Sequence, residues 1–360
     1  MNDAPWAATF LYCRAKTSRL PTRPEQQFRM YLSIITKAWK ITKAWKSRRI
    51  DHFCEKRPDS EVKPMIEETP FFLNTLGYRL YCILYRPQCA AKCAVLLCHP
   101  FAEEKLWSQR VFVSFARRLA ENGYAVLRLD YMGHGDSDGA FSHADVTTRL
   151  SDIAAGLDYL KSHLGAHVPL CLIGLRFGAT LAALMSEDRK DVEQLILWEP
   201  IINGDMYARQ LLRINIATQT AVYKQVVKNS EALVEMLHTG KTVNVDGYEI
   251  GRTFYEQLTA IDLLRSPLGF NGKVLVVSIV KHKDKVDRQS LRLKEKYPGC
   301  DYRTVVEEHF WSNIPHYYKR ADRLAEATLQ WMEEIYANVT RANRKPDEKP
   351  SPWDLASPRR

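Results

Sequence analysis

Short, continuous runs of apolar residues alternate along the middle of the chain with longer segments in which apolar residues recur at helical spacing. The apolar runs predict β-strands at Phe71–Thr75, Arg79–Tyr85, Cys93–Cys98, Tyr124–Leu129, Leu170–Leu175, Val192–Trp198, Lys273–Val280 and Asp301–Val306. The helical spacing predicts helices at Phe112–Glu121, Val146–Leu164, Phe177–Ser186 and Ala321–Tyr336. Fully apolar strands interleaved with helices are typical of a mainly parallel sheet covered by helices on both faces, so we predict an α/β fold.

Residues 201–266 interrupt this alternation. The segment has helical spacing and a predicted hairpin at Thr242–Ile250, which turns on Asp246-Gly247. Ligands bind at the carboxyl ends of the strands in open α/β sheets, and an insertion that follows a strand covers that edge. We therefore interpret residues 201–266 as a helical lid, with an insertion of no function as the alternative.

The patterned region spans residues 65–340 and is predicted to be one domain. Residues 1–64 form a basic extension that we expect to be poorly ordered; its tandem repeat ITKAWK-ITKAWK at residues 35–46 could instead form a basic helix for a membrane or partner surface. Residues 341–360 are rich in proline and charge and are expected to be disordered. We hypothesise that translation starts at Met65, which peptides from residues 1–64 in the mature protein would contradict.

Charge and cysteine content exclude several classes of function. The formal charge of +10 divides into +8 in residues 1–64, +3 in residues 341–360 and −1 in the middle, so no nucleic-acid-binding face is predicted for the domain. The eight cysteines have no zinc-like spacing, and several lie in apolar runs, which suggests small buried side chains in a reducing compartment. No cofactor, metal site, transmembrane segment or secretory signal is predicted, and the expected location is the cytoplasm.

The strongest chemical motif is the run Gly174-Leu175-Arg176-Phe177-Gly178-Ala179, where a strand turns directly into a helix. A strand–turn–helix with glycines on both sides of a central residue is the nucleophile elbow, whose central residue projects into a pocket. Here that residue is arginine. Its guanidinium stays protonated at physiological pH, so Arg176 cannot act as a nucleophile and acyl-enzyme chemistry is not available at this position.

A second run, Gly135-Asp136-Ser137-Asp138-Gly139, matches G-x-S-x-G literally. It follows a strand but leads into a loop at residues 140–144 instead of a helix, so its context differs from that of an elbow. We interpret it as a turn that shapes the domain, with Ser137 as nucleophile in a minority hypothesis.

The loop His99-Pro100-Phe101-Ala102-Glu103-Glu104 follows the first apolar parallel strand. In this architecture such a loop donates a backbone N–H to an oxyanion hole together with the residue after the nucleophile. Phe101, Phe177 and Glu103 are therefore the predicted oxyanion or ligand-binding residues. Arg176 begins a helix, where a cation is unfavourable unless an anion joins it. The candidates are Glu103, Glu104, Asp284 or a bound carboxylate or phosphate.

The remaining catalytic candidates follow the last two strands. Asp284 is the first choice for a triad acid and Asp287 the second, with a solvated charged loop as the alternative. His309, after the final strand, completes the order of nucleophile position, acid and histidine. A structural histidine packed on Phe310 and Trp311 is the alternative.

With these motifs in place, the chain resembles the α/β-hydrolase superfamily in its serine-aminopeptidase-like branch. More narrowly, it is similar to the exosortase A system-associated hydrolases of type 2. The resemblance covers about residues 70–336 and is carried by PFF, HPFAEE, GHGDSDG, GLRFGA and EEHFW, which begin at residues 70, 99, 133, 174 and 307. It implies hydrolase ancestry, arginine in the elbow and a link to an exosortase or exopolysaccharide system.

Three functions follow from these residues. The first is a non-hydrolytic protein that binds a small anionic or acyl ligand at Arg176. The second is an ester or amide hydrolase, or an acyltransferase, that works without serine and uses His309 as general base and Arg176 as oxyanion stabiliser. The third is an interaction protein that docks on a membrane or partner through residues 1–64. The chemistry of Arg176 favours the first.

Overall fold

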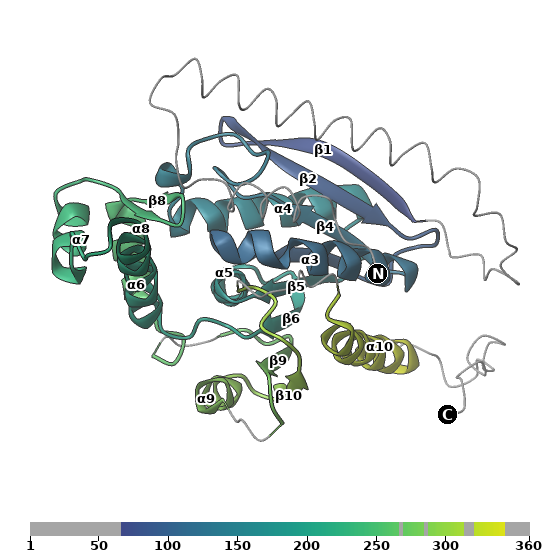
Figure 1. Cartoon of the computed structure of the whole chain (residues 1–360). Coiled ribbons are helices and arrows are strands. Elements are labelled where there is room, and N and C mark those ends of the chain that lie inside the picture. Colours follow the sequence, from purple (N-terminus) through teal and green to yellow (C-terminus); the bar gives the residue numbers. More distant parts are fainter. Residues whose placement is uncertain (1–65, 266–268, 284–286, 313–319, 343–360) are drawn as a thin grey trace, which may run out of the picture. The chain divides into compact units, whose positions relative to one another are not determined.

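A computed structural model describes residues 66–265, 269–283, 287–312 and 320–342 (Figure 1). The chain divides into two units between residues 62 and 63, and all described residues belong to the second unit. The predictions for residues 1–64 and 343–360 lie outside the described residues.

An eight-stranded sheet forms the centre of the domain, in the order β1-β2-β4-β3-β5-β6-β9-β10. β2 is antiparallel to both of its neighbours, and the pairs from β4 to β10 are all parallel. The strands are β1 (Glu67–Thr75), β2 (Tyr78–Arg86), β3 (Ala94–Cys98), β4 (Ala125–Leu129), β5 (Leu170–Leu175), β6 (Val192–Trp198), β9 (Lys273–Val280) and β10 (Asp301–Val306). The predicted α/β class and mainly parallel sheet are confirmed.

Helices cover both faces of the sheet because alternate strand residues point to opposite sides. One hydrophobic cluster joins the sheet to α4 (Val146–Leu164), α5 (Phe177–Asp188) and α9 (Arg288–Lys296). A second cluster joins the other face to α3 (Glu103–Glu121) and α10 (Asp322–Ala342). Both faces of β3 and β5 are buried, which explains why their sequences are continuously apolar.

The predicted lid is a helical insertion with a small hairpin, as expected. It comprises α6 (Gly204–Tyr223), α7 (Ser230–His238), β7 (Val243–Val245), β8 (Tyr248–Ile250) and α8 (Arg252–Ala260). The hairpin turns at Asp246 and Gly247, both with positive φ. The insertion lies at one end of the sheet (Figure 1).

Three expectations need correction. The helix predicted at Phe112–Glu121 begins nine residues earlier, at Glu103, because a polar first turn with two acidic residues suits a helix N-terminus. The last helix runs to Ala342 and so passes the predicted domain end at residue 340. Cys89 is exposed, whereas the other described cysteines are buried, and all of them are free thiols.

Candidate functional site at the end of strand β5

Arg176 occupies a strained turn between β5 and α5. Its φ of 56° and ψ of −123° lie outside the regions that L-residues prefer. The turn is fixed by its backbone, because the Arg176 N–H donates to the Trp198 carbonyl at 2.9 Å and the Arg176 carbonyl accepts from Ala179 at 3.0 Å. Strain of this kind gathers at functional sites and persists only where the surroundings enforce it.

The glycines of the elbow are required by close backbone contacts. A Cβ atom on Gly174 would lie 2.4 Å from the Gly178 carbonyl oxygen, and one on Gly178 would lie 2.2 Å from the Cys98 carbonyl oxygen. Neither backbone neighbour can move without shifting a buried strand or the helix. The geometry therefore matches the predicted elbow, with arginine as its central residue.

The strands on either side of β5 end in similar turns. Ala102, after β3, has a φ of 50°, and Glu199, directly after β6, has a φ of 45°. Parallel strands bring their carboxyl ends to the same edge of a sheet, so these turns and Arg176 gather at one edge.

Arg176 forms an internal ion pair with Glu104 in the first turn of α3. Its Nη2 and Nε atoms donate to the same oxygen, Glu104 Oε1, at 3.2 and 3.3 Å. The side chains are only 14% and 16% exposed. The guanidinium carbon also lies 5.8 Å from the ring centre of Tyr207 in the lid and 5.6 Å from that of Trp311.

The charges of the pair shift each other's pKa, and neighbouring residues contribute. Burial acts to lower the pKa of Arg176, and Glu104, Tyr207 and Glu199 outweigh it, so this pKa is raised. Burial raises the pKa of Glu104 above its ordinary value, although Arg176 opposes the change. The second carboxylate oxygen, Glu104 Oε2, is buried, and a hydrogen bond between Tyr207 and the Glu104 carboxylate also acts to lower this pKa.

Aromatic rings fill the space beside the elbow. Phe101, Phe177 and the lid residue Phe254 are each at most 2% exposed. The Phe101 ring stacks on Phe254 at 4.6 Å between centroids, and the Phe177 ring meets both at 5.9–6.0 Å. The structure thus brings the predicted oxyanion residues Phe101 and Phe177 together and places the lid directly on them.

Glu103, the third predicted ligand-binding residue, is not the partner of Arg176. Burial raises its pKa, with a further contribution from Asp246 in the lid hairpin, and a hydrogen bond to Trp107 acts in the opposite direction. Glu103 therefore belongs to the contact between α3 and the lid.

His309 lies at the same edge, separated from Arg176 by a tryptophan ring. The imidazole stacks on Trp311, with ring centres 4.7 Å apart and planes inclined by 16°, and Trp311 lies beneath the Arg176 guanidinium. His309 Nε2 is 3.2 Å from the Ile279 carbonyl oxygen, which it can contact only as a donor. That tautomer commits Nε2 to the backbone of β9.

The structure describes only one of the two predicted triad acids. Asp284 lies outside the described residues. Asp287 is the N-cap of α9, where its carboxylate accepts from the Gln289 N–H at 2.9 Å and from the Ser290 hydroxyl. An aspartate in this position caps the start of a helix, which corrects its interpretation as a triad acid.

Glu199 is a carboxylate of the site that the sequence reasoning missed. It follows β6 directly, and its Oε2 accepts from the Ile279 N–H at 2.7 Å, so Glu199 and His309 hold the two backbone groups of one residue. Burial raises its pKa, while that hydrogen bond and Arg176 lower it. The signal was an acidic residue at the end of an apolar strand, in the run Trp198-Glu199-Pro200.

Ser137 serves the turn in which it lies. Its hydroxyl donates to the Asp130 carbonyl and accepts from the Tyr81 N–H at 2.8 Å. Ser137 thus links β2 to the residue after β4, which agrees with its interpretation as part of a structural turn.

His99 is likewise a structural residue of its loop. Its Nδ1 lies 2.8 Å from the Pro100 carbonyl oxygen, and its Nε2 accepts from the Tyr131 N–H at 3.3 Å. Burial, with nearby positive charges, lowers its pKa well below the ordinary value. A neutral His99 thus fixes the backbone that carries Phe101.

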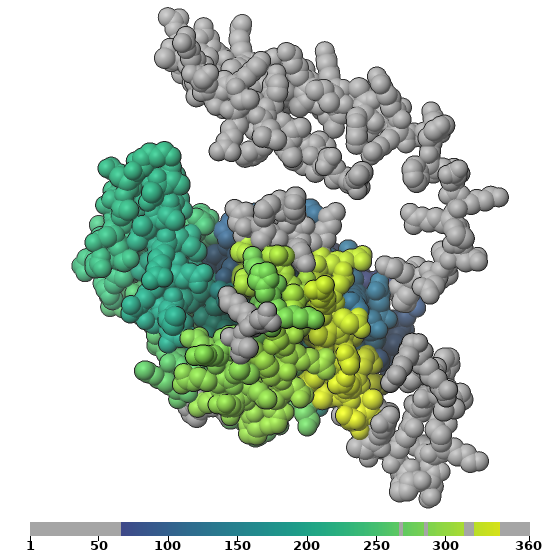
Figure 2. All heavy atoms as spheres, turned by 60° about the horizontal axis from the view of Figure 1, so that its bottom comes forward, coloured from purple at the N-terminus to yellow at the C-terminus, as the bar shows by residue number. Residues whose placement is uncertain are grey.

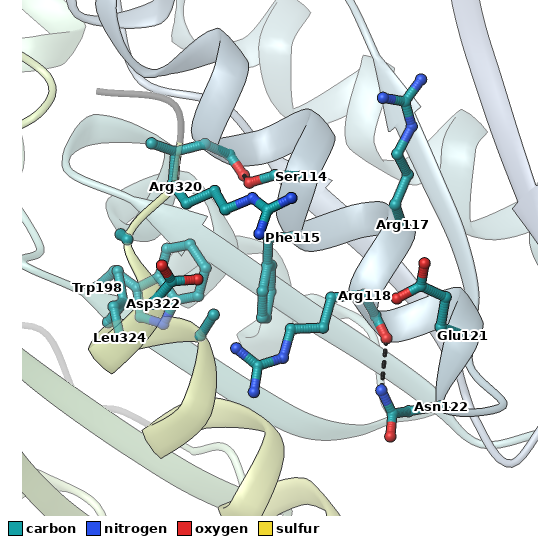
Figure 3. A pocket seen from close by; sticks show the side chains of 13 residues that line it. Ser114, Phe115, Arg117, Arg118, Glu121, Asn122, Trp198, Arg320, Asp322 and Leu324 are labelled. Carbon is teal, nitrogen blue, oxygen red and sulfur yellow. Dashed lines mark hydrogen bonds between the residues drawn. The ribbon is translucent and has the colours of Figure 1, made fainter. Parts of the chain in front are cut away.

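A cavity of about 440 Å³ lies on the face of the sheet that α3 and α10 cover, between these two helices (Figure 3). Trp198 and Phe115 lie at its apolar side, and arginines stand around its rim. Its lining comprises Val111, Ser114, Phe115, Arg117, Arg118, Glu121, Asn122, Trp198, Arg320, Ala321, Asp322, Leu324 and Ala325, so it does not include Arg176. In the part of the chain that the structure describes, no group of His, Cys, Asp and Glu residues is arranged to hold a metal ion.

Comparisons with solved structures identify the architecture. The ferulic-acid-bound Est1E of Butyrivibrio proteoclasticus is 19% identical and superposes with a TM-score of 0.54, covering 74% of this chain and 99% of that one. The esterase domain of a Rhodothermus marinus protein is 18% identical, with a TM-score of 0.51, and covers 75% and 98%. The chain has the α/β-hydrolase fold. The Agrobacterium vitis S4 putative hydrolase, 16% identical with a TM-score of 0.50, covers 74% and 98%.

Sequence comparisons agree with this fold. The family model described as serine aminopeptidase, S33, matches residues 90–248, which include the elbow and most of the lid. An uncharacterized protein of Rickettsia prowazekii (strain Madrid E) is 28% identical over 109 residues, 30% of this chain. The match spans 44% of that relative's own length. No helix within the described ranges is long and apolar enough to cross a membrane.

Proposed function

We propose that this α/β-hydrolase-fold protein does not hydrolyse esters or amides and instead binds a small carboxylate or related anion at Arg176. The ion pair between Arg176 and Glu104 at the elbow carries the proposal. The guanidinium stays protonated and has no free lone pair with which to attack, so no acyl-enzyme can form on it. What the elbow offers is a fixed cation in a site largely closed to water.

Glu104 shows that a carboxylate fits against this cation. One of its oxygens accepts both guanidinium contacts, so the pair is not bidentate, and Tyr207 also hydrogen-bonds this carboxylate. An external carboxylate with two oxygens in the plane of the guanidinium would form the stronger bidentate arrangement. We therefore treat Glu104 as an internal anion that competes with the ligand for Arg176.

The alternative is hydrolysis without serine, in which His309 activates a water molecule. Trp311 brings His309 and Arg176 to one edge of the sheet, which favours this route. The contact of Nε2 with the Ile279 carbonyl makes that nitrogen a donor, so the general base on this route would be His309 Nδ1. A location in the cytoplasm and a link to an exosortase or exopolysaccharide system remain predictions from the sequence.

Ester turnover separates the two functions. We expect the purified protein to release p-nitrophenol from p-nitrophenyl acetate and butyrate no faster than buffer, with no initial burst, because no acyl-enzyme forms. The matched variants are His309→Ala and Ser137→Ala. Turnover that His309→Ala abolishes and Ser137→Ala preserves would establish the alternative, and loss with Ser137→Ala alone would assign the nucleophile to Ser137.

A further inference from the structure

The last turn of α6, the connection that follows it and the first residue of α7, residues 220–230, expose a group of apolar side chains; we call this segment the lid tip. The exposed fractions of Val222, Tyr223, Val226 and Val227 are 63%, 62%, 51% and 57%. Figure 2 shows the lid, in green, projecting from one side of the domain. Four large apolar side chains grouped at the end of a projection are unusual on a protein that meets only water.

The lid tip is held in this exposed conformation by a buried glutamine. Gln219, 8% exposed, accepts from the Val227 and Lys228 N–H groups at 2.8 and 2.7 Å through Oε1. Its Nε2 donates to the Lys228 carbonyl at 3.0 Å. Asn229 then caps α7 by accepting from the Ala232 N–H at 3.0 Å. Val226 and Val227 thus project from a loop whose backbone is fixed by these hydrogen bonds.

The positive charge of the lid tip favours a negatively charged partner. Residues 220–230 contain Lys224 and Lys228 and no acidic residue. Valine and tyrosine side chains interspersed with lysines are typical of segments that enter the headgroup region of a membrane, where the apolar side chains leave water and the ammonium groups meet lipid phosphates. The nearest acidic residue in the sequence is Glu231, in the first turn of α7.

We propose that the lid tip docks on an anionic lipid surface. Its four apolar side chains enter the interface, and its two lysines contact lipid phosphates. This surface is distinct from residues 1–64 and does not depend on the ligand proposed for Arg176. α6 connects the two regions, since Tyr207 near its start contacts Arg176 and Tyr223 at its end belongs to the lid tip.

Co-sedimentation of the full chain with vesicles tests the proposal. We expect binding to phosphatidylcholine vesicles that contain phosphatidylglycerol, and much weaker binding to pure phosphatidylcholine. The variant Val226→Asp/Val227→Asp should reduce the partition coefficient by about tenfold or more, because two valines no longer leave water. Lys224→Gln/Lys228→Gln should reduce binding to the anionic vesicles alone.

Leu76→Asp is the matched control. Leu76 is 74% exposed in the β1–β2 turn, far from the lid in sequence, and its positive φ of 44° suits aspartate. It should bind like the wild type, and all variants should unfold at the wild-type temperature. Undiminished binding of the double valine variant, equal loss with Leu76→Asp, or no binding to either vesicle would overturn the proposal. Valine-dependent self-association without vesicle binding would assign the lid tip to a protein partner instead.

Discussion

Replacing Arg176 with methionine is expected to lower the free energy of unfolding by about 3–5 kcal/mol at neutral pH. The substitution keeps most of the apolar stem but leaves the Glu104 carboxylate in a largely buried position without its cation. Breaking one side of such a pair costs more than the pair itself contributes, because an uncompensated charge remains. Urea unfolding of the wild type and Arg176→Met measures the difference.

The loss should depend on pH and should be relieved by a second substitution. Without Arg176, the folded-state pKa of Glu104 rises further above its unfolded value. A carboxyl group with a raised folded pKa stabilises the fold below its unfolded pKa and loses that contribution as pH rises through the folded pKa. The free energy of unfolding of Arg176→Met should therefore be closest to that of the wild type near pH 4, and the difference should be largest above pH 7. The double variant Arg176→Met/Glu104→Gln should recover most of the lost free energy of unfolding. A loss that depends neither on pH nor on Glu104 would contradict the ion pair.

Gly178→Ala is expected to destabilise the domain by at least about 3 kcal/mol or to prevent folding. The added Cβ would lie 2.2 Å from the Cys98 carbonyl oxygen and 2.5 Å from that of His99, both backbone atoms. Relief requires α5 to move away from β3, which would open the turn that holds Arg176. Thermal and urea unfolding report the loss.

Gly269→Ala is the control for this substitution. The nearest atom to its added Cβ is the carboxylate end of Glu187, at 3.3 Å, which can move with its side chain. We expect Gly269→Ala to change the free energy of unfolding by at most about 0.5–1 kcal/mol. Equal stability of Gly178→Ala and Gly269→Ala would show that the elbow is looser than the structure indicates.

The parallel strands could be predicted from sequence because burial on both faces makes them continuously apolar. The bounds of β5, β6, β9 and β10 agree with the predictions to the residue. The start of α3 could not be predicted in the same way, because residues 103–110 are mostly polar and their helix is decided by tertiary contacts on one face. Local pattern thus located the sheet better than the helix that carries Glu104.

The sequence identified a few candidate anions for Arg176 but could not show which of them pairs with it. Glu103 and Glu104 are adjacent, and successive residues of a helix point about 100° apart, so the register of α3 decides which one faces the elbow. The contacts of Tyr207 and Trp311 with Arg176 join segments distant in sequence, which no local pattern reveals. Glu199 could have been predicted as a site residue from its position directly after the apolar strand β6.

Calorimetric titration with butyrate tests the central claim most directly, because it asks whether Arg176 is a carboxylate site that Glu104 occupies. Glu104→Gln removes the internal anion and leaves the cation in place. We predict that this variant binds butyrate at least about tenfold more tightly than the wild type, a difference of about 1.4 kcal/mol. Butyramide, which has no charge, should not bind. Arg176→Met/Glu104→Gln should lose the interaction, and butyrate affinity that is the same with and without Arg176 would contradict the account.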